Sequence, residues 1–267
     1  MKIKAIIWLI LLTTVVRSYS AGPVIHLYLA QKFCQIVNIT DDRFLQAFYR
    51  GTLLPDIRYL TTLTRYQTHS RASLDRVYLY AERALQNHDY YYAFAAGMIF
   101  HSYLDYLREG IVVKNKVYEL LTSKGVPEQE MVTFVKLLEE ELFFDKTDKG
   151  LTVIGLEESS PEELLFMQRH NQSLQVLDVW HKNVMRSLSC SISQLFAECA
   201  ASNSTIYNYI SPELQSIWNE LFSRMLNDIE VIELVAKTIT DVEHFLLIEQ
   251  YKSKRGSIDE KEIYRWP

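Results

Sequence analysis

The sequence predicts an all-α fold, a compact multi-helix domain organised around one buried helix. Apolar residues recur at helical spacing through most of the chain, and 48% of its 267 residues are apolar. Its 8 glycines and 6 prolines are few for this length, which favours long helices. The sequence has no glycine-rich phosphate-binding motif and no Ser-His-Asp arrangement, so any chemistry should be metal chemistry.

The central element is a predicted helix from Tyr91 to Leu107, apolar on nearly every face and therefore expected inside the core. His101 and Asp105 interrupt this apolar character, and their spacing puts both on one helix face. Gly97 lies one turn earlier on that face and would leave room beside the imidazole. A buried carboxylate such as Asp105 needs a partner. The partner could be a metal ion held jointly with His101, the guanidinium of Arg108, or His101 itself.

Proline, glycine and capping residues divide the rest of the chain into further helices. The helices predicted before the central one are residues 24–37, 43–50 and 72–85. Those predicted after it are residues 114–123, 128–144, 161–201 and 212–250. The intervening predictions are a helix stop at Gly51, an extended or turn element at Leu54–Asp56, and polar loops over residues 61–71 and 145–160.

Residues 1–20 have the features of a cleaved export signal. Two lysines precede an apolar run from Ile6 to Val16 that is too short to span a bilayer, and small residues follow it. We therefore expect an exported protein, periplasmic or secreted, whose mature chain begins at Ala21 or Gly22. The predicted organisation is a signal peptide over 1–20, one helical domain over 21–250 and a charged tail over 251–267.

Charge and cysteine content limit the remaining classes. The net charge of -5 gives no electrostatic reason to expect nucleic-acid binding. The cysteines are odd in number, and Cys190 and Cys199 lie in one predicted helical region, where a bridge between them would require the chain to turn back. Buried free thiols are the simpler expectation for these two residues and for Cys34.

Four short motifs occur in the order found in a known enzyme family. They are Gly22-Pro23-Val24-Ile25-His26, Gly51-Thr52-Leu53-Leu54-Pro55-Asp56, Thr68-His69, and Gly97 with His101-x-x-x-Asp105. Together they resemble the zinc-dependent phospholipase C/D family, which includes bacterial zinc phospholipase C and the catalytic domain of glycosylphosphatidylinositol-specific phospholipase D. The family is related to the single-strand-specific zinc nucleases. The resemblance covers roughly residues 21–110 and implies a phospholipase C-like helical domain.

The resemblance implies a centre of one to three Zn²⁺ ions. Asp105 is shared between two of the metals, and the N-terminal amine of the mature chain is a ligand that exists only after the leader is removed. Asp56 is also the carboxylate that activates water. The implied activity is phospholipase C/D-type hydrolysis of phospholipid head groups or other phosphodiesters, with transient contact with a membrane surface. The metal-binding residues it implies are Ala21, His26, Asp56, His69, His101 and Asp105.

The chain departs from the family after the central helix. Relatives carry another histidine shortly after the helix aspartate, but Tyr106–Ile111 contains none. Glu109 could replace it as an oxygen ligand, or it could be a solvated residue at the helix end. Two alternatives to the phospholipase follow, a catalytically impaired, zinc-stabilised helical binding protein and a single-strand nuclease-like hydrolase. Further candidate ligands are His170, His181 and His244.

Overall fold

The computed structural model describes residues 22–69, 73–150, 154–202 and 212–253, and within these ranges it contains helices and no strand. The predicted all-α fold is confirmed. The first helices are α2 (Pro23–Val37), α3 (Asp42–Leu53), the 3₁₀ helix η1 (Leu54–Leu60), α4 (Arg65–Thr68), α5 (Leu74–Asn87) and α6 (Tyr90–Lys114). The later ones are α7 (Val117–Ser123), η2 (Glu128–Glu130), α8 (Met131–Phe143), η3 (Phe144–Lys146), α10 (Pro161–Arg169), α11 (Leu174–Ser189), α12 (Ile192–Ser202), α13 (Pro212–Leu226) and α14 (Ile229–Ser253).

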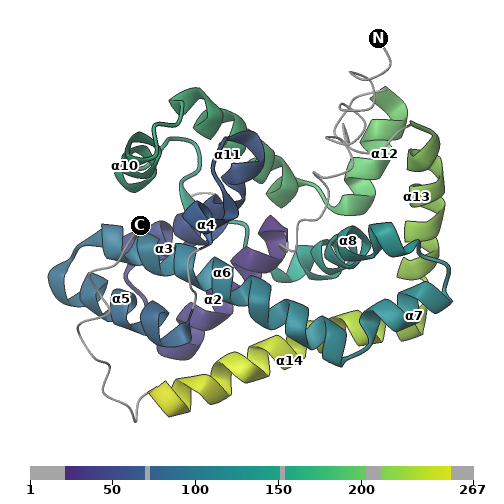
Figure 1. Ribbon diagram of the computed structural model, residues 1–267, viewed down its shortest axis with the longest axis horizontal. Coiled ribbons are helices and arrows are strands. Elements are labelled where there is room, and N and C mark those ends of the chain that lie inside the picture. The colour runs from purple at the N-terminus through teal and green to yellow at the C-terminus, as the bar shows by residue number, and fades with distance from the viewer. Residues whose placement is uncertain (1–21, 70–72, 151–153, 203–211, 254–267) are drawn as a thin grey trace.

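Two apolar cores share the long helices α6 and α14, which run between the two sides of the molecule (Figure 1). The larger core contains α2, α3, α5 and the first part of α6, with fully buried Phe33, Phe48 and Phe100 in mutual ring contact. The smaller core contains α7, α8, α12, α13 and the start of α14. The motifs singled out in the sequence all lie on elements of the larger core.

Two glycines bring α3 and α6 into close backbone contact. A Cβ at Gly97 would lie 2.1 Å from the carbonyl oxygen of Phe48, and one at Gly51 would lie 2.0 Å from that of Phe94. The predicted helix stop at Gly51 is therefore wrong, because α3 continues to Leu53 and the glycine serves the approach of the two backbones. The space beside Gly97 is likewise taken by the backbone of α3.

The segment before the predicted loop is also helical. Leu54–Leu60 forms η1 instead of the predicted extended or turn element. Pro55 is tolerated there because the first N–H groups of a helix have no partner within it. The following predicted loop, 61–71, contains the short helix α4, which carries a capping box between Thr64 and Gln67.

The central helix is longer than predicted. It runs past Gly110 to Lys114, because one glycine inside a helix costs only about 1 kcal/mol and Val112 is buried in the smaller core. The predicted helical region 161–201 contains α10, α11 and α12.

Several predictions concern residues outside the described part of the chain. These are the leader over 1–20, the N-terminal residue Ala21, and nearly all of the charged tail; the side chain of Cys199 is not described either. Cys34 is a buried thiol, as predicted, whereas Cys190 is partly exposed. None of the described helices combines the length and apolarity that a membrane crossing requires.

The contact between α3 and α6 predicts opposite effects for two glycine substitutions in α6. Gly97→Ala should destabilise the protein by about 2–3 kcal/mol or more, because its Cβ would overlap the α3 backbone. Gly110→Ala, where a Cβ meets nothing within 4 Å, should instead stabilise it by about 0.5–1 kcal/mol. Urea denaturation of both variants measures the difference, and equal stabilities would contradict the proposed role of Gly97.

Candidate metal centre

Five side chains from four elements meet in the larger core. His26 comes from α2, Asp56 from η1, His69 from the residue that ends α4, and His101 and Asp105 from α6. His26 and His101 are each 1% exposed and Asp105 is 2% exposed, whereas the side chain of Asp56 is 13% exposed. The sequence therefore identified residues that the fold brings together, although up to 79 positions separate them along the chain.

Asp105 lies at the centre of the group. Its Oδ1 is 3.4 Å from His26 Nε2. Its Oδ2 is 3.3 Å from His69 Nε2 and 3.7 Å from His101 Nε2. One buried carboxylate thus faces three imidazoles, which makes it the natural bridging group of the cluster.

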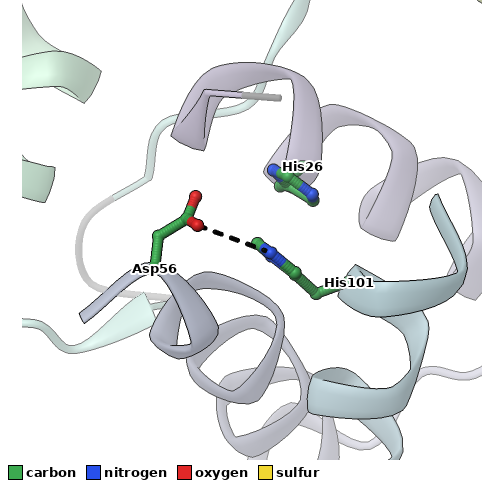
Figure 2. A group of neighbouring side chains, drawn as sticks. All are labelled: His26, Asp56 and His101. Carbon is green, nitrogen blue, oxygen red and sulfur yellow. Dashed lines mark ion pairs between the residues drawn. The ribbon is translucent and has the colours of Figure 1, made fainter. Parts of the chain in front are cut away.

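The carboxylate of Asp56 points toward the His101 ring, next to His26 (Figure 2). Its Oδ1 lies 3.8 Å from His101 Nε2, and the His101 ring stacks on the His26 ring with 3.8 Å between centroids and 7° between planes. The ligand atoms form two sets, in each of which all the atoms lie within 4.8 Å of one another. The sets are His26, Asp56 and His101, and His69, His101 and Asp105.

Backbone carbonyl groups fix the tautomers of two of the histidines. His101 Nδ1 donates to the Thr52 carbonyl oxygen at 2.8 Å, and His26 Nδ1 donates to that of Gly22 at 3.1 Å. A carbonyl oxygen only accepts, so Nδ1 carries the proton in both rings and Nε2 points its lone pair into the cluster. Carbonyl groups hold metal-binding histidines in the same way.

The Nε2 atoms lie close to one another and to the carboxylates. His26 Nε2 is buried and makes no hydrogen bond with the described residues. His101 Nε2 and His69 Nε2 lie 3.1 Å apart, and two lone pairs at that distance repel unless a proton or a metal ion lies between them. Nitrogen and carboxylate ligands converging in this way fit Zn²⁺, which binds both types.

Electrostatics in the site favour the metal-binding protonation states of His101 and Asp105. For His26, burial acts to lower the pKa, but Asp105 outweighs it and raises that pKa. Burial, together with repulsion from His26, holds the pKa of His101 well below its usual value, so this imidazole is neutral at pH 7. Burial acts to raise the pKa of Asp105, but the neighbouring histidines outweigh it and hold that pKa well below its usual value. Neutral imidazole and ionised carboxylate are the forms that bind metal.

Glu140 of α8 was not predicted, yet it positions the start of α2. Its carboxylate accepts the backbone N–H groups of Val24 and Ile25 at 3.0 and 2.9 Å, directly before His26. Gly22 packs so closely on it that a Cβ there would lie 2.3 Å from the carboxylate carbon. Burial raises the pKa of Glu140 to about 7. The sequence feature that could have indicated this role is the position of Glu140 among apolar residues of the predicted helix 128–144.

The predicted ion pair between Asp105 and Arg108 is wrong. Arg108 Nε instead donates to Glu139 at 2.6 Å, and both side chains are fully buried. The nearest charged group to Asp105 outside the histidines is Arg65, whose Nη2 lies 3.2 Å from Oδ2. Arg108 therefore ties α6 to α8 and leaves Asp105 to the cluster.

The other candidate ligands lie elsewhere. Glu109 accepts the Tyr118 hydroxyl at 2.9 Å, so neither expectation for it, a metal ligand or a solvated helix end, describes its environment. His181 Nε2 pairs with buried Glu163 at 3.0 Å. The two ligand sets found among the described residues likewise do not include His170 or His244.

Comparisons with known proteins do not assign a family. No protein-family model matches the chain, and no curated protein and no solved structure shows significant similarity to it. The resemblance to zinc-dependent phospholipases therefore stays a prediction from the sequence.

The ligand geometry predicts that zinc stabilises the protein through His101. At a free zinc concentration about 100 times Kd, binding adds about 2.7 kcal/mol, which for a chain of this size raises Tm by roughly 5–10 °C. His101→Ala should lose most of this increase because it removes the ligand common to both sets. His88→Asn is the matched control, since His88 is an exposed turn residue with φ of 51° that asparagine also adopts. Equal zinc shifts in both variants would contradict the site.

The environment of Glu140 predicts a pH-dependent difference in stability. An acid whose pKa rises from 4.5 to about 7 on folding binds protons more tightly when folded, so it lowers the free energy of unfolding as pH increases through that window. The change corresponds to about 3 kcal/mol, and Glu140→Gln should lack it.

This difference is measured by urea denaturation at pH 5 and pH 8 in the presence of a chelator. Glu141→Gln, the neighbouring substitution in α8, is the control and should follow the wild-type protein. Parallel pH profiles for Glu140→Gln and wild type would show that Glu140 does not titrate in this range.

Proposed function

We propose that the protein is an exported, zinc-dependent phosphodiester hydrolase that acts on phospholipid head groups, as the phospholipase C/D family does. The main support is the convergence of three imidazole Nε2 atoms on the buried carboxylate of Asp105, with Asp56 beside them. These five residues, with the amine of Ala21 after cleavage of the leader, would hold the metal. The order of the motifs in the sequence adds independent support.

Bound zinc would supply a lowered pKa for water and charge neutralisation on a phosphoryl group. The residues of the chain supply the remaining requirements. Asp56 is more exposed than Asp105, the other carboxylate of the cluster. We therefore expect Asp56 to accept the proton of an attacking water that enters from the solvent. The Thr52 and Gly22 carbonyl groups keep His101 and His26 in the required tautomers.

A phospholipid is favoured over a nucleic acid by the charge of the chain. The net charge is -5, whereas proteins that bind single strands use basic grooves. The bond that is broken, C-type or D-type, depends on how the head group is oriented toward Asp56. Faster cleavage of single-stranded DNA than of any phospholipid would favour the related nuclease activity instead.

A second candidate is a helical binding protein that uses zinc only for stability. It is favoured by the absence of a histidine from Tyr106–Ile111, directly after Asp105, where Glu109 is engaged with Tyr118. In that case His101→Ala would lower Tm, and the wild-type protein would have no hydrolase activity to lose.

Hydrolysis should depend on Asp56 and on metal. Asp56→Asn is expected to lower kcat by about 100-fold or more, because the amide cannot accept a proton, and a chelator should abolish activity. Glu109→Gln is the control and should retain activity, because Glu109 follows Asp105 by four residues in the sequence but contacts Tyr118. The assay is release of the head group from short-chain phosphatidylcholine and phosphatidylinositol. Zinc-loaded protein that leaves both lipids and generic phosphodiesters intact would contradict the proposal.

A further inference from the structure

Two arginines border the carboxylates at the solvent side of the cluster. Arg65 of α4 places Nη2 3.2 Å from Asp105 Oδ2, and its side chain is 44% exposed. Arg58 of η1 places Nε 4.0 Å from Asp56 Oδ1, and its side chain is 14% exposed. Each aspartate of the metal centre therefore lies within 4.0 Å of a guanidinium nitrogen.

Tyr59 holds the guanidinium of Arg58 in place, while one N–H donor of Arg58 makes no hydrogen bond with the described residues. Its guanidinium lies over the Tyr59 ring, 4.1 Å from the centroid, and its Nη2 contacts the Tyr59 hydroxyl. Its Nε is buried and makes no hydrogen bond with any described residue. A buried, unsatisfied donor on a charged group costs about 1–3 kcal/mol or more unless a ligand or water accepts from it. Arg58 is thus suited to receive an anionic oxygen.

A third cation approaches from α8. Burial lowers the pKa of Lys136 to about 8, against the attraction of Asp56 and Asp105. The other carboxylate that acts on Lys136, Glu139, already pairs with Arg108. The printed contacts thus pair one guanidinium with each aspartate, Arg58 with Asp56 and Arg65 with Asp105.

The two guanidiniums already balance the charges of Asp56 and Asp105 before any metal is bound. Adding a divalent cation to the five ligands would make the site strongly positive, and a positive site with restricted access attracts anions. Guanidinium groups match phosphate oxygens through paired N–H donors. The partial exposure of Arg65 leaves its side chain room to exchange the Asp105 contact for a ligand.

We propose that Arg65 and Arg58 form an anion-binding edge of the metal centre and bind the phosphoryl oxygens of the substrate. This rests on the proposed function in that it names how the same site recognises a phosphodiester. The shared chemistry is the phosphoryl group itself, whether it belongs to a lipid head group or to a small diester. Tyr59, packed under Arg58 and 38% exposed, lies at the same edge.

The direct test is titration of zinc-loaded mature protein with inorganic phosphate by calorimetry. Arg65→Ala and Arg58→Ala should each weaken phosphate binding about 10-fold or more, since a hydrogen bond to a charged group is lost. Arg65→Lys should recover part of the loss. Arg43→Ala is the matched control. Arg43 of α3 is an exposed arginine that also lies over a tyrosine ring, that of Tyr90. It should bind phosphate as the wild type does.

Zinc content is measured for every variant by elemental analysis. Unchanged zinc with weaker phosphate binding in the Arg65 and Arg58 variants supports the proposal. Wild-type phosphate affinity in these variants, loss of zinc in Arg65→Ala, or no phosphate binding by the wild-type protein would each overturn it.

Kinetics separate this proposal from the proposed function. Short-chain phosphatidylcholine and bis(p-nitrophenyl) phosphate share only the phosphodiester, so Arg65→Ala should raise KM for both. An effect on the lipid alone, or no effect on either, would overturn the anion-binding role while the hydrolase remains. If the wild-type protein hydrolyses neither substrate but binds phosphate through Arg65, the proposed function fails and the anion site stands.

Discussion

The burial of Asp105 is the constraint on which the site depends. An ionised carboxylate with 2% exposure loses most of its hydration, and that cost must be offset by donors and positive charge within the protein. The partners come from two other parts of the chain, His26 on α2 and, on and directly after α4, Arg65 and His69, as well as from α6 itself. Removing any one of these elements would leave a charge buried in the larger core, so the fold around α6 and the site stabilise each other.

The close contact between α3 and α6 connects backbone packing to the chemistry of the imidazole. Because Gly51 and Gly97 have no side chains, the two backbones approach within a distance that a Cβ would prevent. That approach brings the Thr52 carbonyl to His101 Nδ1 and so decides which ring nitrogen faces the cluster. The tautomer of the central histidine is therefore a consequence of helix packing in this fold.

Local patterns in the sequence predicted most of the helices, and the order of the short motifs predicted the described members of the cluster. Helical periodicity predicted α6, and the spacing of His101 and Asp105 predicted their common face. A glycine, however, gives the same signal whether it ends a helix or permits close packing, which is why the prediction at Gly51 was wrong. Local patterns also could not predict contacts between residues that are far apart in the sequence. Glu140 acts on the backbone 115 and 116 residues earlier, and nothing near it in the sequence specifies that target.

The geometry also limits how many metal ions the described residues can bind. His101 belongs to both ligand sets, but its Nδ1 donates to Thr52, so it has a single lone pair and can bind only one ion. Asp105 has two oxygens that point to different histidines, Oδ1 to His26 and Oδ2 to His69. If His101 bound an ion together with His69, the ligands left for a second ion would be His26, Asp56 and the other oxygen of Asp105.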